Sequence, residues 1–479
     1  MDLLVGEIFR NAARAVPDRV AAALDREVLT FGQIETRSTA TAHALRARGI
    51  GRGDRVAAWV PTNLALVPLF AGLAKAGAVF VPLNPALSGP EVDPSLILLR
   101  PALIVTDAHH LDDARATGVE ACVLEDLGDE TAGGEVEDVG LAETDPHVVF
   151  LTSGSTGAPK GVILSHRVNV LRSHPSALLE PRGAIACPYP MFHMAAWTIA
   201  LQQWQARDRV VFLRAADAHT ICRAVEEHAA ARLNCIPALW RRILDHLPGC
   251  AHDLSSLRFA DTGTSATPPE LLDAIAGALP GAHIRVFYGS TEAGGVAALD
   301  HDDLRWKPGS VGTPAPWAEV RVDQTGELRV RSPLLFDGYF DDPGATKDAL
   351  ADGWYRTGDL AEIDADGYIT IVGRAGDLIR TGGEAVAPAD VEAVLATHPS
   401  IEDVAVIGVP DERWGEIVCA VVVPAEGADP PDVEVLRAHC AGRLVAFKHP
   451  RRVVVVDAVP RTAATGQIQR KLLVERLAP

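Results

Sequence analysis

The chain has few cysteines, and their spacing matches neither a disulfide framework nor a common metal motif. Seven cysteines are scattered along 479 residues, and no two of them form a C-x-x-C pair. An odd number of scattered cysteines indicates neither a disulfide scaffold nor a zinc site, and it favours a reducing compartment. The first seven residues contain no basic segment followed by an apolar one, so we expect no secretory signal. We therefore expect a cytoplasmic protein.

Long apolar runs and positive charge are also scarce. The longest uncharged run covers residues 56–74, but Pro61, Asn63 and Pro68 interrupt it. Such a run favours strand, turn and helix over a membrane span. The formal net charge is −19 at pH 7. Because nucleic acids and anionic membranes attract basic surfaces, we expect neither as a general partner. A polyanionic substrate would need basic residues gathered locally.

The residues that are present are typical of a globular chain of two or three domains, with 48% hydrophobic and 22% charged residues. Thr30 and Gln33 have the spacing of a capping box, which predicts a helix of about 16 residues ending near Gly49. A second helix is predicted at residues 64–75, ending near Gly77. Apolar runs predict strands at residues 55–60, 78–82, 103–106 and 121–124. This alternation indicates βαβ units around a largely parallel sheet.

One stretch between two apolar runs has the composition of a polyphosphate site. It reads Leu151-Thr152-Ser153-Gly154-Ser155-Thr156-Gly157-Ala158-Pro159-Lys160-Gly161, and it predicts a tight loop between two buried strands. Glycines let the backbone approach a ligand, hydroxyl and N–H groups donate to phosphate oxygens, and a lysine supplies positive charge. It is not the usual P-loop, since Pro159 stands where that motif has glycine. The alternative is a flexible Ser/Gly turn. The candidate phosphate ligands are Thr152, Ser153, Gly154, Ser155, Thr156 and Lys160.

Two later motifs each present a carboxylate after a turn. Phe287-Tyr288-Gly289-Ser290-Thr291-Glu292 is an aromatic strand end that opens into a small-residue turn. Trp354-Tyr355-Arg356-Thr357-Gly358-Asp359-Leu360 is the other. A hard cation that bridges phosphates prefers oxygen ligands, so Glu292 is a candidate ligand of Mg2+. The alternative for Glu292 is a solvated turn residue.

These three motifs, in this order, resemble the adenylate-forming superfamily of acyl-CoA synthetases, peptide-synthetase adenylation domains and luciferases. The resemblance extends from about residue 10 to residue 475. It implies an α/β fold with a large N-terminal acyl-adenylate-binding domain of βαβ-built sheets and helices (residues 1–373), a hinge (374–376) and a small mobile α+β domain (377–479). In that C-terminal domain, Asp390 is predicted to cap a helix at 391–398, and strands are predicted at 404–409, 417–423 and 452–456.

The resemblance also implies roles for single residues. Tyr288 stacks on adenine, Thr291 contacts the α-phosphate and Glu292 holds Mg2+. Asp359 accepts the ribose hydroxyls, and Arg374 also reaches the ribose. Gly263 and Thr264 belong to an adenine-binding segment, where Thr264-Ser265 depart from the small residues that are common in the family.

Further residues are assigned to the acid and to CoA. His193 is implied to line the carboxylic-acid pocket, although a buried connector with a satisfied histidine is the alternative. Residues 234–237 resemble another pocket segment. Gly376 stands at the pivot of the hinge, where glycine can absorb a large backbone rotation. The implied CoA contacts are Gly382 and Gly383, which line the pantetheine tunnel, and Phe447, Lys448 and Arg451, which meet the nucleotide or form a solvated basic face.

The chain departs from the family near its C-terminus. Most members carry a Pro-Arg-Thr-x-x-Gly-Lys-Ile segment whose lysine bridges the carboxylate and the α-phosphate during adenylation, whereas this chain has Gln467 at the lysine position. Lys471 is the nearest lysine. Glutamine can donate a hydrogen bond but carries no charge. Together with Gln467, the candidate catalytic residues are Thr291, Glu292 and His193.

Three functions are compatible with this sequence. The first is an acyl-CoA ligase that mainly performs thioesterification, in which acyl-adenylate and CoA give acyl-CoA and AMP, with a separate enzyme supplying the adenylate. The second is a complete ATP-dependent ligase in which Lys471 or another base replaces the lysine, or in which Gln467 is an engineered change. The third is a silent nucleotide-binding scaffold. A carrier protein is an alternative acceptor to CoA. Small residues near the expected pocket, namely Ala195, Ala196, Gly294 and Gly295, favour a bulky apolar acid.

Overall fold

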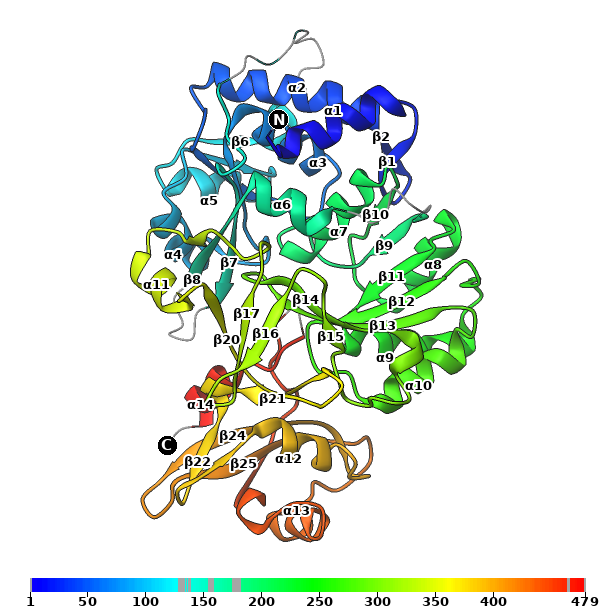
Figure 1. Ribbon diagram of the computed structural model, residues 1–479, viewed down its shortest axis with the longest axis vertical. Coiled ribbons are helices and arrows are strands. Elements are labelled where there is room, and N and C mark those ends of the chain that lie inside the picture. Colours follow the sequence, from blue (N-terminus) through cyan, green and yellow to red (C-terminus); the bar gives the residue numbers. More distant parts are fainter. Residues whose placement is uncertain are drawn as a thin grey trace.

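The computed structural model describes residues 2–127, 134, 136, 139–153, 159–174, 182–462 and 466–477. Most of the described chain forms a large N-terminal body of two mixed sheets and their helices, and the C-terminal part lies at one end of the molecule (Figure 1). No helix in these ranges combines the length and the apolar character that crossing a membrane requires.

The first mixed sheet has the order β18-β8-β7-β4-β3-β5-β6. Its parallel centre confirms the predicted βαβ units, since β3 pairs in parallel with both β4 and β5 and the intervening helices cross between them. Its strands are β3 (Arg55–Trp59), β4 (Val79–Pro82), β5 (Leu103–Thr106), β6 (Ala121–Val123), β7 (Pro146–Ser153), β8 (Pro159–Ser165) and β18 (Gly338–Tyr339). Its helices are α3 (Leu66–Ala76), α4 (Gly89–Leu99) and α5 (Leu111–Ala116).

The second mixed sheet has the order β15-β14-β13-β12-β11-β9-β10-β1-β2, with antiparallel strands at both edges. Its strands are β1 (Val20–Leu24), β2 (Glu27–Thr30), β9 (Ile185–Cys187), β10 (Val210–Phe212), β11 (Arg232–Cys235), β12 (Phe259–Gly263), β13 (His283–Ser290), β14 (Gly294–Leu299) and β15 (Thr313–Pro314). The surrounding helices are α1 (Val5–Ala15), α2 (Phe31–Ala47), α6 (His166–Ser173), α7 (Met194–Gln205), α8 (Ala218–His228), α9 (Pro237–His246) and α10 (Pro269–Ala278). One buried core spans both sheets, and Phe70 stacks on Trp197 in it with 4.3 Å between ring centroids.

A third, antiparallel sheet leads from the large body to the C-terminal part. It consists of β16 (Glu319–Val322), β17 (Glu327–Arg331), β19 (Leu350–Ala351), β20 (Trp354–Ile363) and β21 (Ile369–Arg374). Helix α11 (Pro343–Ala349) precedes β19. Strand β21 ends directly at a short 3-10 turn over Ala375–Asp377. The turn lies at the predicted hinge (374–376). The division into domains at residues 1–373 and 377–479 remains a prediction.

The C-terminal part is built on its own sheet, with separate hydrophobic clusters on the two faces. Its strands are β22 (Ile379–Thr381), β23 (Glu384–Val386), β24 (Ile401–Asp411), β25 (Gly415–Pro424) and β26 (Arg452–Val455), and its helices are α12 (Pro388–Leu395), α13 (Val433–Cys440) and α14 (Arg470–Leu477). The strands predicted at 404–409, 417–423 and 452–456 are confirmed. The predicted cap at Asp390 is wrong, because α12 follows Ala387 and the Asp390 carboxylate accepts a hydrogen bond from the Lys448 ammonium instead.

The helix signals near the N-terminus are confirmed. The Thr30 hydroxyl accepts a hydrogen bond from the Gln33 N–H (3.2 Å), and the Gln33 side chain accepts one from the Thr30 N–H (2.9 Å). Helix α3 ends at Gly77, whose φ of 77° is the left-handed conformation that glycine adopts without steric cost. Helices α2 and α3 then pack closely, because a side chain at Gly72 would meet the Thr41 side chain at 2.8 Å and the Ser38 carbonyl at 2.9 Å.

This close approach predicts opposite outcomes for two glycine substitutions. Gly72→Ala should lower the free energy of unfolding by about 1–3 kcal/mol, because the added methyl group forces α2 and α3 apart. Gly277→Ala is the control, since Gly277 lies in helix α10 with nothing within 4 Å of the new atom. We expect it to leave stability unchanged or to raise it by up to about 1 kcal/mol. Chemical denaturation of both variants makes the comparison, and equal stabilities would contradict the packing argument.

Candidate active site

The predicted phosphate loop connects two antiparallel strands of the first mixed sheet. Thr152 near the end of β7 lies opposite Lys160 near the start of β8, as expected for a tight connection between buried strands. The backbone of Ser153 is the last described part of β7. The predicted ligands Gly154, Ser155 and Thr156 lie outside the described residues. The strands therefore confirm that the loop joins two neighbouring strands, but they extend into its predicted range, to Ser153 and from Pro159.

Lys160 and Glu292 meet at the same tyrosine. The Lys160 ammonium lies 4.9 Å from the centroid of the Tyr339 ring, and the Tyr339 hydroxyl donates to Glu292 Oε1 over 3.1 Å. Burial raises the pKa of Tyr339, and the Glu292 carboxylate adds to that shift, so the phenol stays protonated and can donate. A cationic and an anionic group therefore face one region, which suits phosphates and a cation that bridges them.

A buried arginine holds the turn that carries Thr291 and Glu292. The Arg172 guanidinium, on α6, donates to the carbonyl oxygens of Leu334, Thr291 and Glu292, each over 2.8 Å. Burial lowers the pKa of Arg172 to about 10, a shift opposed by the Glu292 carboxylate, so the side chain is charged at neutral pH. Three bonds from one rigid planar group fix the backbone next to the magnesium candidate. The sequence analysis missed Arg172, since nothing local to α6 distinguishes it.

Arg172 also corrects the interpretation of the small pocket residues. A side chain at Gly294, where φ is 70°, would come within 3.0 Å of Arg172 Nε. The space at Gly294 therefore accommodates the arginine and not an acyl group. Ala196 is fully buried in the core of the large body. Of the four small residues, only Ala195 and Gly295 remain as candidates for lining a spacious pocket.

The second and third motifs meet at one carboxylate. Tyr288, near the end of β13, donates its hydroxyl to Asp359 Oδ2 over 2.6 Å. Arg374 Nε lies 2.6 Å from Asp359 Oδ1, and the two residues are paired across β20 and β21. Burial raises the pKa of the Asp359 carboxyl, while the Arg374 charge and the Tyr288 hydrogen bond oppose that shift. Each carboxylate oxygen keeps a further lone pair that can accept from a ribose hydroxyl.

Gln467 reaches the large body from the C-terminal part. Its side-chain amide donates to the Thr264 carbonyl oxygen over 3.1 Å. Thr264 follows β12 with a φ of 68°, a conformation uncommon outside glycine. Gly263 before it has no room for a side chain, because an added atom would lie 2.5 Å from the Phe287 carbonyl oxygen. The structure therefore brings Gln467, Gly263 and Thr264 together.

His193 lies at the start of α7 and acts as its cap. Its Nδ1 accepts a hydrogen bond from the Ala195 N–H over 3.2 Å, and its ring stacks on Tyr189 at a centroid distance of 6.1 Å. Burial lowers the pKa of His193 to about 4, so the imidazole is neutral at pH 7. Because Nδ1 accepts, the proton of the neutral ring is on Nε2. Tyr189 in turn donates to the Asn234 side chain over 2.8 Å, which links His193 to residues 234–237.

Two of the residues predicted to contact CoA, Gly382 and Arg451, lie against a tryptophan in the C-terminal part. Gly382 and Gly383 form the turn between β22 and β23, with φ of 60° and 90°. A side chain at Gly382 would lie 2.7 Å from the Trp414 ring, and the Arg451 guanidinium lies 4.1 Å from that ring's centroid. The sequence analysis missed Trp414. Phe447 packs against the C-terminal core, and Lys448 is occupied by its bond to Asp390.

Known proteins resemble this chain over nearly its whole length. Residues 9–340 match the AMP-binding enzyme family, and residues 390–465 match the AMP-binding enzyme C-terminal domain family. The chain is 34% identical to the feruloyl-CoA synthase of an Amycolatopsis species, with 96% of this chain and 97% of that protein covered. It is 32% identical to the long-chain-fatty-acid–CoA ligase FadD13 of Mycobacterium tuberculosis, with 98% of each covered.

A solved structure has the same arrangement of both parts. The ATP-bound structure of MatB from Rhodopseudomonas palustris superimposes with a TM-score of 0.88 at 27% identity, and 99% of each chain is covered. The sequence matches, the superposition and the meeting of the second and third motifs at Asp359 agree with one another. The chain therefore belongs to the AMP-binding enzyme family, in the acyl-CoA ligase branch of the adenylate-forming superfamily.

Proposed function

We propose that this enzyme mainly performs thioesterification, in which an acyl-adenylate and CoA give acyl-CoA and AMP. The observation that carries the proposal is the hydrogen bond from the Gln467 side chain to the Thr264 carbonyl oxygen (3.1 Å). It brings a neutral amide to the segment expected to bind adenine, at the position where the family resemblance implies a lysine.

The missing charge bears on the first half-reaction. In adenylation, a carboxylate oxygen attacks the α-phosphorus of ATP and pyrophosphate leaves, so two anions must approach each other. Lys160, and Mg2+ held by Glu292, would neutralise phosphate charge. Neither replaces a cation that touches the carboxylate and the α-phosphate at once. Losing one such stabilising group costs roughly 10²–10³ in rate.

The second half-reaction does not require a cation at position 467. The CoA thiolate attacks the acyl carbon, a thioester bond forms, and AMP leaves with the electron pair of the broken anhydride bond. In the family resemblance, the C-terminal domain has by then rotated and carried this segment away. The hinge can supply that rotation here, because Gly376 has open space around its α-carbon. Rotation would bring the turn at Gly382 and Gly383, with Trp414 and Arg451, toward the adenylate.

The expected substrate is an apolar carboxylic acid, presented as its adenylate by a separate enzyme. His193 and Tyr189 form a stacked pair at the start of α7. Because His193 is neutral at pH 7, this wall suits an acyl chain better than a second carboxylate. The names of the relatives, a feruloyl-CoA synthase and a long-chain-fatty-acid–CoA ligase, also point to apolar acids. A carrier-protein thiol remains an alternative acceptor.

A complete ATP-dependent ligase is the second candidate. The names of its relatives favour it, since they are CoA ligases and synthases. It requires Lys471 or another group to supply the missing charge. Lys471 lies in α14, beyond the segment that contacts Thr264, and its side chain is exposed. Arg470 beside it anchors that helix through Asp377 (3.1 Å) and Glu392 (2.7 Å). A silent scaffold is the third candidate.

The hinge generates the first functional prediction. Gly376→Pro, which restricts φ at the pivot, should abolish the conversion of acyl-adenylate and CoA to thioester while leaving nucleotide binding nearly intact. Gly376→Ala is the matched control and should keep the activity, because nothing lies within 4 Å of the added methyl group. Product formation is followed by mass spectrometry. Undiminished thioester formation by the proline variant would contradict the domain rotation.

The second functional prediction concerns Asp359, where the second and third motifs meet. The protein should bind a non-hydrolysable acyl-adenylate analogue, and Asp359→Ala should weaken binding by about 1.5–3 kcal/mol for each charged hydrogen bond lost. Asp366→Ala, at an exposed carboxylate that pairs with Lys307, should bind as the wild type does. Calorimetry measures the affinities, and thermal unfolding checks that each variant is folded. Equal affinity of wild type and Asp359→Ala would argue against this site.

The third prediction concerns Gln467. Wild-type protein should exchange pyrophosphate into ATP only slowly in the presence of acids, yet form thioester from acyl-adenylate and CoA. Gln467→Lys should raise the exchange rate at least ~10-fold, with little change in the thiol step, because it restores the charge. Gln469→Lys is the matched control, since it adds the same charge two residues away on an exposed side chain.

Lys471→Ala separates the first two candidates. Brisk exchange by the wild type that collapses in Lys471→Ala would mean that Lys471 replaces the lysine and that the enzyme is a complete ligase. Brisk exchange that survives Lys471→Ala would mean that adenylation depends on neither residue. If the protein performs neither half-reaction but still binds the acyl-adenylate analogue, the third candidate, a silent nucleotide-binding scaffold, is supported.

A further inference from the structure

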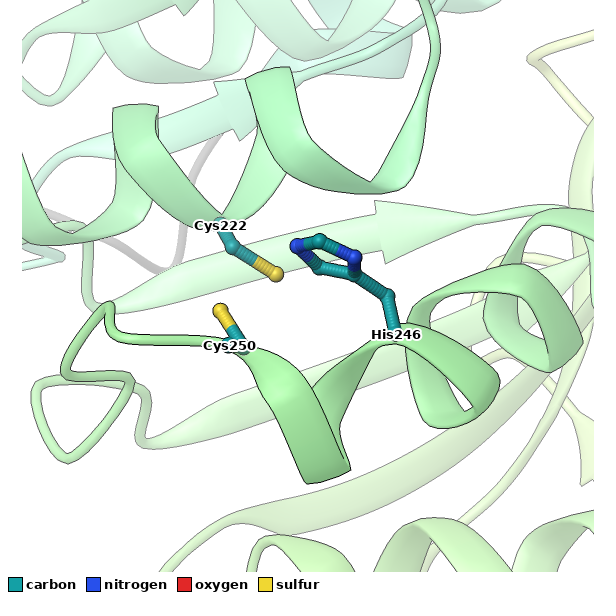
Figure 2. A group of neighbouring side chains, drawn as sticks. All are labelled: Cys222, His246 and Cys250. Atoms are coloured by element: carbon teal, nitrogen blue, oxygen red, sulfur yellow. The ribbon is translucent and has the colours of Figure 1, made fainter.

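Two thiols and an imidazole meet away from the adenylate site, on the helices beside the second mixed sheet. Cys222 lies on α8, His246 is the last residue of α9, and Cys250 follows the 3-10 turn Leu247–Gly249. Figure 2 shows the two thiols pointing toward each other and the ring of His246 directed at them. Their sulfur and nitrogen atoms all lie within 4.8 Å of one another. Folding thus gathers residues whose spacing contains no C-x-x-C pair.

The imidazole has an unused ligand atom at this point. His246 Nε2 is fully buried and has no hydrogen-bond partner within the described part of the chain. A buried polar atom without a partner costs free energy, so native structures rarely leave one unless another group binds there. Cys222 is fully buried and Cys250 partly buried. A metal ion between the sulfurs would give Nε2 the partner that it lacks.

The distances suit a small thiophilic ion. Zinc binds sulfur at about 2.3 Å and imidazole nitrogen at about 2.0–2.1 Å in a tetrahedron, which separates its ligand atoms by about 3.5–3.8 Å. Atoms that lie within 4.8 Å of one another reach that geometry by side-chain shifts on the order of 1 Å. We propose that Cys222, His246 and Cys250 form a structural Zn2+ site, with a fourth position for water or for another imidazole.

The surroundings offer such an imidazole. His219 lies on α8, and its ring centroid is 5.9 Å from that of His246 and 5.2 Å from that of His252. His252 is held by the Glu226 carboxylate, with 2.6 Å between Nδ1 and Oε2. Burial raises the pKa of the Cys222 thiol to about 12, and the neighbouring Cys250 adds to the shift. Metal binding takes thiolates, so binding one Zn2+ forms two Zn–S bonds and displaces the proton of each thiol.

The position of the site indicates a structural role. Helix α9 has ten residues and so spans about 15 Å. The other end of α9 follows Ile236. The Ile236 side chain lies beside Gly466, since an atom added at Gly466 would come within 3.0 Å of it, and Gly466 precedes Gln467. Zinc at the His246 end would tie α9 to α8 without touching the adenylate. It would stabilise the helix that begins directly after Ile236, the residue beside Gly466.

Metal binding to the full-length protein tests the proposal. Zn2+ binding to the metal-free protein should release two protons per ion. The loaded protein should keep one equivalent of Zn2+ through dialysis and should unfold at a higher temperature than the metal-free protein. Co2+ in place of Zn2+ should show the sulfur-to-metal charge-transfer absorption of thiolate ligands. Cys222→Ala and Cys250→Ala should each weaken binding at least 100-fold. Cys440→Ala is the control, because Cys440 is a buried cysteine of the C-terminal part, and it should bind as the wild type does.

X-ray absorption of the zinc-loaded wild type keeps the test decisive if the alanine variants do not fold. Two sulfur neighbours at about 2.3 Å are expected. A shell of light atoms alone would overturn the proposal. So would zinc that Cys222→Ala and Cys250→Ala retain as tightly as the wild type does. A Cys222–Cys250 disulfide, found by mass spectrometry in protein that does not take up zinc, would overturn it as well, because both thiols would then be consumed.

Discussion

The adenylate site depends on one buried carboxylate and the two groups that bind it. Asp359 is bonded to the Tyr288 hydroxyl at one oxygen and to the Arg374 guanidinium at the other. Removing Arg374 would leave the buried Asp359 charge without a counter-charge, which costs far more than an exposed pair contributes. Removing Tyr288 would take away one of its hydrogen bonds. Tyr288 belongs to the second mixed sheet, whereas Asp359 and Arg374 belong to the antiparallel sheet that leads to the hinge. The bonds of the Asp359 carboxylate therefore connect two sheets at the place where the nucleotide is expected to bind.

Arg172 imposes a second requirement, on the backbone rather than on a ligand. Its guanidinium takes three carbonyl oxygens as partners, and two of them belong to Thr291 and Glu292. The carbonyl dipoles and the nearby Glu292 carboxylate compensate the buried charge. The absence of a side chain at Gly294 makes room for it. An arginine on helix α6 thus holds the main chain of the magnesium candidate, Glu292, in the turn between β13 and β14.

The proposed function assigns the two half-reactions, adenylation and thioesterification, to two orientations of the C-terminal domain. In this structure the Gln467 amide reaches Thr264, while Gly382 and Arg451, two of the residues expected to meet CoA, lie against Trp414 in the C-terminal part. On the proposed function, a change at position 467 would act on adenylation alone. The reason is the domain rotation that the family resemblance implies, because it carries position 467 away from the site before the thiol attacks.

The sequence by itself determined the local elements and the family. The capping box at Thr30, the helix end at Gly77 and the alternation of strands and helices depend on neighbouring residues, so they could be predicted from order alone. The three motifs carried the family resemblance for the same reason. Only the tertiary structure decided the partners of residues far apart in the chain. Asp390 pairs with Lys448 and does not cap a helix, and Gly294 makes room for Arg172. Cys222 meets His246 and Cys250. Such contacts arise when helices and sheets pack on one another, and no local periodicity encodes that packing.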